Sequence, residues 1–191
     1  MGGPSPRNLA GMDAYRRLRS REAYRNRWIS VEVHEIVHPS GVAGEHVAIV
    51  TPAASAVVVL DGEELVFARQ PRFAAQKTTV EIVKGGAEAG ESALACARRE
   101  LREELGLQGG IWESLGEVYE LPSIVAHPVA LFVARDLSAC SGAQEDVESI
   151  SPVRMSRAAA FDRALRGDIS DAVTLAALLR FGLRSGALLL S

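Results

Sequence analysis

The sequence predicts a mixed α/β (α+β) fold. Short β-branched runs follow Trp28, one helix-like segment interrupts them between Glu91 and Leu105, and further strands and then helices complete the chain. This order favours helices packed on a mixed sheet over a doubly wound parallel sheet, in which strands and helices alternate regularly.

Composition narrows the class of protein. The 191 residues suit one domain, and 48% hydrophobic with 24% charged residues is average for a globular chain. The net charge of -3 supplies no basic field for a nucleic-acid polymer. Two cysteines, Cys96 and Cys140, give neither a disulfide framework nor zinc-site spacing, so we expect a reduced, cytoplasmic setting. No segment is apolar for long enough to suggest a membrane partner.

The N-terminal quarter reads as an extension. Residues 1–11 carry Gly, Pro and Ser without periodicity and are expected to be a disordered leader. Residues 12–45 are expected to form an N-terminal arm, with 15–27 as a short helix, an extended arm or simply a solvated basic segment. An alternating pattern, with Val31, Val33 and Ile36 on one face, predicts a strand there.

The main domain is expected over residues 46–191. Strand-like runs occur before the central helix at 47–51, 54–60, 65–70 and 78–83, and after it at 117–120, 129–134 and 150–155. Asp61-Gly62 is a hairpin signal between two of these runs. Two closing helices are expected at 157–165 and 170–185.

The central helix is predicted over 91–105. Leu94, Ala97, Leu101 and Leu105 form its apolar stripe, and Gly106 is well placed to end it in a left-handed conformation. The residues before it, Gly85-Gly86, stop the preceding strand.

Three glutamates crowd the last turns of this helix. Glu100 and Glu104 are like charges four residues apart, and Glu103 joins them near a helix end that prefers cations. Along the helix no arginine is placed to relieve the Glu100/Glu104 repulsion. An all-oxygen cluster beside the apolar stripe suits a hard cation such as Mg²⁺ more than zinc. The alternative is that neighbouring arginines neutralise the acids on a solvated face.

The spacing around these acids matches a known pattern. Residues 85–107 fit the pattern G-x5-E-x7-R-E-U-x-E-E-x-G-U, with U aliphatic, at each fixed position. The residues at these positions are Gly85, Glu91, Arg99, Glu100, Leu101, Glu103, Glu104, Gly106 and Leu107. In this respect the chain resembles the Nudix hydrolase superfamily. The resemblance implies that family's α/β/α sandwich with a mixed sheet and an N-terminal antiparallel strand extension.

The resemblance also implies a reaction. A Nudix hydrolase cleaves a nucleoside diphosphate linked to another moiety with Mg²⁺, or alternatively Mn²⁺, as cofactor. Glu100, Glu103 and Glu104 would hold the metal together with the carbonyl of Lys84, and would thereby activate a bound water. Arg99 would orient the glutamates, Glu91 would support them, and Gly85 would allow a tight turn.

The segment Gly85–Leu107 that fits this pattern is called the box below. Features outside the box resemble the ADP-ribose pyrophosphatase branch. They are the strand at Ser30–Val33, which in that branch supports a homodimer, the Arg69–Arg72 segment, the Glu81–Gly86 entry to the box, and Pro122. Val83 stands where the branch has proline, and the segment Leu121–His127 departs from its usual motif. We therefore expect ADP-ribose first, and a different nucleoside diphosphate sugar, such as a GDP-sugar, or a dinucleotide as the alternative.

Candidate substrate contacts are Trp28, Arg69, Arg72, Glu81, Pro122 and His127. Trp28 would stack on a base or else pack at a dimer contact, and Arg69 or Arg72 would meet phosphate through a bidentate fork or else be solvated. Glu145 in the 138–148 segment is our candidate general base. The alternatives are that Glu145 is a metal ligand, with Glu103 or Glu104 deprotonating the water, or that the segment is an acidic surface loop. An enzyme is favoured over a non-catalytic nucleotide sensor because a sensor has no need of the intact box.

Overall fold

The structure, a computed structural model, describes residues 15–140 and 149–188. The chain divides into two compact units: residues 1–51 with 123–126, and residues 52–122 with 127–191. Cys96 and Cys140 are both free thiols. Among the described helices, none combines the length and apolar character needed to cross a bilayer.

The first unit is a three-stranded antiparallel sheet. Its strands are β1 (Arg16–Arg25), β2 (Ser30–Val37) and β3 (Ala43–Val50), in the order β1-β2-β3. The expected antiparallel extension is therefore confirmed, and the arginine-rich segment is extended rather than helical. Val33 and Ile36 of β2 are both buried, but their spacing of three residues puts them on opposite faces of the strand, so the expected apolar alternation on one face is wrong. Every residue of β1 is exposed. Ile49 of β3 also pairs with the short segment around Val125.

The second unit is built on a seven-stranded mixed sheet. Its strands are β4 (Ala54–Asp61), β5 (Glu64–Arg72), β6 (Lys77–Glu81), β7 (Val83–Gly86), β8 (Leu107–Tyr119), β9 (Pro128–Ala139) and β10 (Ser151–Ser156). The order is β10-β5-β4-β9-β8, with β6 paired to β5 and β7 paired to β4. Strands β4 and β9 run parallel and the other pairs are antiparallel, so the sheet is mixed, as expected.

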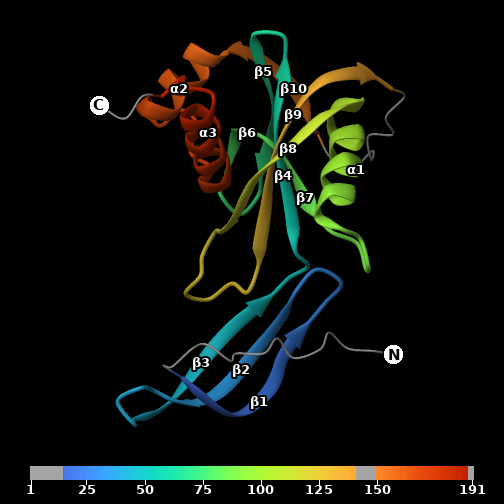
Figure 1. Ribbon diagram of the computed structural model, residues 1–191. Coiled ribbons are helices and arrows are strands. Elements are labelled where there is room, and N and C mark those ends of the chain that lie inside the picture. The colour runs from blue at the N-terminus through green and yellow to red at the C-terminus, as the bar shows by residue number, and fades with distance from the viewer. Residues whose placement is uncertain (1–14, 141–148, 189–191) are drawn as a thin grey trace. The chain divides into compact units, whose positions relative to one another are not determined.

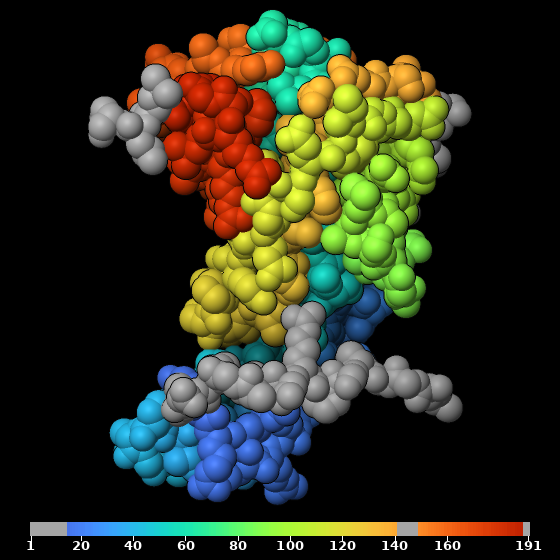
Figure 2. All heavy atoms as spheres, in the orientation of Figure 1, coloured from blue at the N-terminus to red at the C-terminus, as the bar shows by residue number. Residues whose placement is uncertain are grey.

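Helices cover both faces of this sheet (Figure 1). Helix α1 (Ala93–Leu105) lies on one face, and α2 (Arg157–Arg166) and α3 (Ala172–Arg184) lie on the other. The space-filling view shows α3 in red and α1 in light green on opposite sides of the strands (Figure 2). The second unit is therefore the α/β/α sandwich expected from the resemblance.

Strand β4 shows how one segment supports both layers. Val57 and Val59 pack with Ala97 and Leu101 of α1. The alternate residues Ala56, Val58 and Leu60 join the core beneath α3. Successive side chains of a strand point to opposite faces, so a strand buried on both sides reads as the continuous apolar run seen in the sequence.

Some element boundaries differ from expectation. The Asp61-Gly62 hairpin is confirmed, with Asp61 paired to Glu64 and Gly62 at φ 60°. The single strand expected at 78–83 is two strands, β6 and β7, separated at Ile82. Strand β8 begins at Leu107, ten residues before the expected start, because its glycines masked the strand pattern.

Candidate active site

The box folds into a strand, a tight loop and a helix. Strand β7 ends at Gly86, and Ser92 caps α1 by accepting a hydrogen bond from the Ala95 amide. Helix α1 ends at Gly106, whose φ of 61° is the left-handed conformation predicted for it. Ser55 of β4 donates to the Ala93 carbonyl at 2.7 Å and thereby fixes the start of the helix to the sheet.

Arg99 is the centre of the box. It donates to both carboxylate oxygens of Glu91 at 3.1 Å, to Glu100 at 2.8 Å, to Glu103 at 2.8 Å and to the Gly86 carbonyl at 2.7 Å. Its hydrogen bonds to Glu91 are the main cause of a raised pKa for the guanidinium, and the same bonds lower the pKa of Glu91. One planar side chain therefore orients the loop, the helix start and two of the clustered acids.

This geometry corrects one sequence expectation. The helical pattern indicated no arginine that relieves the charge of Glu100, yet Arg99 contacts it directly. A helical pattern does not predict this pair because adjacent helix residues do not normally face each other. Here the long Arg99 side chain lies against the end of β7, where it bonds the Gly86 carbonyl, and the Glu100 carboxyl group lies against Gly85 of the same strand.

Glu100 occupies the space that Gly85 leaves open. A β-carbon placed on Gly85 would collide with all three atoms of the Glu100 carboxyl group. Cys96 lies against the same backbone, since its thiol donates to the Gly85 carbonyl at 3.5 Å. Glycine is therefore required at position 85 because the carboxylate of Glu100 lies directly on the backbone.

Glu103 and Glu104 lie in different environments. The Glu103 side chain is 38% exposed and contacts Arg99. Glu104 is only 6% exposed and belongs to the buried face of α1, beside Ala97 and Leu101. The sequence predicts all three glutamates beside the apolar stripe, and the structure buries Glu104 together with Ala97 and Leu101 of that helix.

The donor set fits a hard divalent cation. Glu100, Glu103 and Glu104 offer carboxylate oxygens on one helix, and the glycine at position 85 allows Glu100 to reach the backbone. Oxygen ligands of this kind are those that Mg²⁺ and Mn²⁺ prefer. Over residues 15–140 and 149–188, no three His, Cys, Asp or Glu side chains converge as a finished ligand set, and Arg99 instead joins the acids.

Arg72 and Glu81 form a second charged pair. Arg72 Nε and Nη2 donate to the two oxygens of Glu81 at 3.0 and 2.7 Å, and Thr79 donates to the same carboxylate. Burial would raise the pKa of Glu81, but the Arg72 and Thr79 hydrogen bonds outweigh it and the pKa is lowered. The Arg72 guanidinium, which was expected to contact phosphate, is therefore hydrogen-bonded to Glu81. The hydrogen bond to Glu81 is the main cause of a raised pKa for Arg72, and the negative charge of Glu104 also contributes to it.

The remaining predicted residues are more scattered. Arg69 and Pro122 are exposed, and His127 is half-buried, with its pKa lowered mainly by desolvation. Trp28 belongs to the first unit, where it is 63% exposed and carries the Arg27 guanidinium 4.3 Å from its ring centre. Glu145, the candidate general base, lies outside the described residues.

The structure adds residues that the sequence did not indicate. Lys84 Nζ contacts Glu120 at 2.9 Å and Asp171 at 3.0 Å. Burial of Asp171 would raise its pKa, but the charge of Lys84 and the hydrogen bonds from Thr174 hold it below its usual value. The only sequence signal was an Asp three residues before a Thr at a helix start, which marks a helix cap and not a partner 87 residues away.

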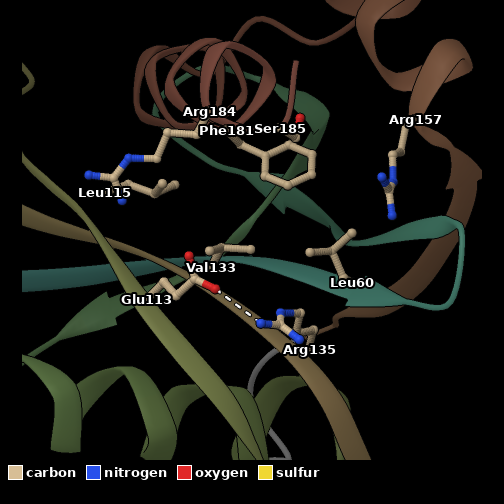
Figure 3. Close-up of a pocket in the computed structure, with 9 residues that line it drawn as sticks. All are labelled: Leu60, Glu113, Leu115, Val133, Arg135, Arg157, Phe181, Arg184 and Ser185. Carbon is tan, nitrogen blue, oxygen red and sulfur yellow. Dashed lines mark hydrogen bonds and ion pairs between the residues drawn. The ribbon is translucent and has the colours of Figure 1, made fainter. Parts of the chain in front are cut away.

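A separate cavity of about 240 Å³ lies at the α3 side of the sheet. It is lined by Leu60, Glu113, Leu115, Val133, Arg135, Arg157, Phe181, Arg184 and Ser185 (Figure 3). Glu113 and Arg135 pair at 3.2 Å, and Arg184 donates to the Ser114 carbonyl. No box residue lines this cavity, so it is distinct from the Arg99 network.

Comparison with known proteins agrees with the box. The family model for the NUDIX domain matches residues 50–174, and the model for the nucleoside diphosphate sugar hydrolase N-terminal domain matches residues 15–46. A crystal structure of an ADP compounds hydrolase superposes with a TM-score of 0.82 over 91% of this chain and 95% of that chain. At 23% identity this likeness concerns the fold alone.

Two relatives are similar in sequence. The ADP-ribose pyrophosphatase of Bacillus subtilis (strain 168) is 32% identical over 111 residues, which are 58% of this chain and 60% of that protein. The methanol dehydrogenase activator of Bacillus methanolicus is 29% identical over 122 residues, which are 63% of this chain and 66% of that protein. Each match therefore spans less than two thirds of the relative. The NUDIX domain model covers well over half of the present sequence, so the chain belongs to the NUDIX domain family.

Proposed function

We propose that the chain hydrolyses the diphosphate of ADP-ribose or a related nucleoside diphosphate sugar, giving a nucleoside monophosphate and a sugar phosphate. The observation that carries the proposal is the Arg99 network, which orders Glu91, Glu100 and Glu103 around the Gly85-Gly86 end of β7. The names of the similar proteins, an ADP-ribose pyrophosphatase and an ADP compounds hydrolase, support an ADP compound as substrate.

Mg²⁺ or Mn²⁺ is the proposed cofactor. Glu100, Glu103 and Glu104 would hold it, with the carbonyl of Lys84 as a further ligand. A cation there would offset the diphosphate charge and lower the pKa of water at the site. Arg99 bonds Glu103 through Oε2 only, and a carboxylate oriented through one oxygen can ligate a cation through the other.

The substrate contacts remain proposals with one revision. Arg69, Pro122, His127 and Trp28 keep their proposed roles, whereas Arg72 would reach phosphate only with donors that Glu81 does not use. Glu145 is our proposed general base, with Glu103 or Glu104 as the alternative.

A homodimer in the cytoplasm is proposed for the assembled protein. In the first unit β1 is an edge strand among the described residues, and the unit exposes several large apolar side chains on β1 and in the turns between its strands, among them Leu18, Tyr24, Trp28 and Val42. An exposed edge with apolar side chains favours pairing with another chain. The free thiols of Cys96 and Cys140 agree with a reducing compartment.

The test is product release from a panel of compounds. Purified protein is incubated with ADP-ribose, another nucleoside diphosphate sugar and a dinucleotide, with Mg²⁺ or with a chelator. We expect AMP and ribose phosphate from ADP-ribose only when the cation is present. Turnover that the chelator leaves unchanged would contradict the metal-dependent site.

The alternative is a non-catalytic nucleotide sensor. Calorimetry with the same panel distinguishes an enzyme from a sensor. A sensor binds its ligand without consuming it, so the ligand concentration stays constant over hours, whereas an enzyme converts the ligand to products. Tight binding of ADP-ribose without any AMP would replace the enzyme by the sensor.

A further inference from the structure

Strand β7 is held from both of its faces. Val83 packs beneath α1 with Ala97 and Leu101, whereas Ile82 belongs to the core under α3. Side chains alternate along a strand, so Lys84 shares the α3 side with Ile82 and Gly85 shares the α1 side with Val83. The contacts agree: Lys84 reaches Asp171 at the start of α3, and Gly85 lies against Glu100 of α1.

The Lys84 ammonium joins two distant segments and lies near an acid of its own stretch of chain. It is hydrogen-bonded to Glu120, directly after β8, and to Asp171, directly before α3, and it lies 3.9 Å from Glu81 of β6. Its side chain is only 16% exposed, so these carboxylates replace water around the charge. A half-buried ion pair of this kind has a fixed geometry because leaving either charge unpaired is costly.

Asp171 is itself rigidly placed. Its Oδ2 accepts hydrogen bonds from the amide and the hydroxyl of Thr174 at 2.8 and 2.7 Å, which caps α3. The same Thr174 hydroxyl oxygen accepts the Ile82 amide at 3.1 Å. Helix α3 is anchored in turn by the buried side chains of Val173, Ala177, Leu178 and Phe181. The start of α3 is therefore tied to the chain on both sides of Val83.

We propose that Asp171 and Glu120 are positioning residues that act through the Lys84 ammonium to fix the backbone of Lys84 and Gly85 at the entry to the box. This inference rests on the proposed function, in which the Lys84 carbonyl is a metal ligand. Neither carboxylate needs to touch substrate. Their effect is to keep the backbone at Lys84 in the one position from which Gly85 accommodates Glu100 and the carbonyl serves the cation.

The test uses charge-removing variants with matched controls. Asp171→Asn keeps a good helix cap but removes the negative charge that pairs with the Lys84 ammonium. Glu120→Gln removes the negative charge at the other contact of Lys84. The controls are Asp168→Asn and Glu117→Gln, which change exposed acids three residues from each target. Lys84→Met keeps the backbone carbonyl while removing the ammonium.

The first readout is Mn²⁺ affinity, which is measured from the electron paramagnetic resonance signal of free Mn²⁺. Loss of a group that orients a metal ligand typically weakens binding by 10–100-fold. We expect about tenfold weaker binding for Asp171→Asn and Glu120→Gln, at least as much for Lys84→Met, and no change for the controls. A second readout needs no metal: amide hydrogen exchange of residues 83–86 should accelerate in the same variants.

The outcomes separate the inference from the proposed function. If the target variants bind Mn²⁺ like their controls, even with a lower melting temperature, Asp171 and Glu120 only stabilise the fold and the inference is wrong. If the wild-type protein itself binds no Mn²⁺ at millimolar concentration, the proposed function fails as well. Glu120 is the more exposed of the two acids, so Glu120→Gln keeps the test decisive if Asp171→Asn does not fold.

Discussion

The carboxyl group of Glu100 lies in the space that a β-carbon of Gly85 would fill. The contact joins the end of strand β7 to the middle of α1. It explains why one glycine of the Gly85-Gly86 pair is irreplaceable, whereas a β-carbon on Gly86 would meet no atom within 4 Å.

Replacement of these glycines by alanine should therefore have unequal effects. Gly85→Ala must displace Glu100 or the loop, and such overpacking typically costs about 1–3 kcal/mol of unfolding free energy. We expect Gly85→Ala to lower hydrolysis by at least tenfold and Gly86→Ala to retain it. Steady-state rates and urea unfolding of both variants measure this. Equal behaviour of the two alanine variants would disprove the role of the contact.

Arg99 should not be replaceable by another cation. Lysine keeps the charge, but its three N–H donors cannot replace the five hydrogen bonds that the planar guanidinium makes to Glu91, Glu100, Glu103 and the Gly86 carbonyl. We expect Arg99→Lys to lower kcat by about 10–100-fold, and Arg102→Lys, on an exposed position of the same helix, to leave it unchanged. Full activity of Arg99→Lys would show that charge alone suffices.

Much of α1 was predictable because its signals are local. The apolar spacing and the left-handed Gly106 are both set within a few residues. The start of the helix at Ala93 rather than Glu91 follows from the Ser92 cap, which is not among the features predicted from the sequence. The burial of Glu104 was not predictable, because it depends on the sheet that packs against that face of the helix. The Arg99 contact with Glu100 depends likewise on the Gly85-Gly86 end of β7, against which both side chains lie.

Long-range features were less accessible from sequence. The contact of Lys84 with Asp171 spans most of the domain, and no local pattern encodes it. The first half of β8 was missed because Gly109 and Gly110 both have φ of 75°, which weakens any strand signal. Gly110 is required there, since a β-carbon would collide with the Arg135 carbonyl of the neighbouring strand. The residues of β1 do not by themselves distinguish a helix from an extended arm, and the antiparallel pairing with β2 makes the segment a strand.

The first unit should lose stability in mild acid through His34. Burial is the largest cause that lowers the pKa of this imidazole, which is hydrogen-bonded to Ser20 at 2.8 Å. Because the folded pKa lies below the unfolded value of about 6.5, protonation favours unfolding. Stability should be full above that value and fall as the pH drops below it.

Urea unfolding between pH 8 and pH 5.5 measures this effect. His34→Gln should flatten the dependence on pH, whereas His38→Gln, which leaves His34 in place, should preserve it. An unchanged slope in His34→Gln would assign the acid sensitivity to other groups.

The exposed side chains of the first unit should mediate self-association. Light scattering coupled to gel filtration of the full chain at micromolar concentration is expected to give twice the monomer mass. Leu18 is 53% and Tyr24 is 54% exposed on β1, so changing both to Glu should yield monomers if this strand is at the contact. A monomeric wild-type protein under these conditions would refute the proposed homodimer.

The most direct test of the account compares AMP formation from ADP-ribose by the wild-type protein and by Glu104→Gln at saturating Mg²⁺. Glutamine keeps the shape of the buried side chain and removes the charge proposed to hold the cation. The expected result is a loss of about a hundredfold to a thousandfold or more in kcat, with a folded variant by circular dichroism. Equal rates for the two proteins would contradict a metal-dependent hydrolase centred on α1.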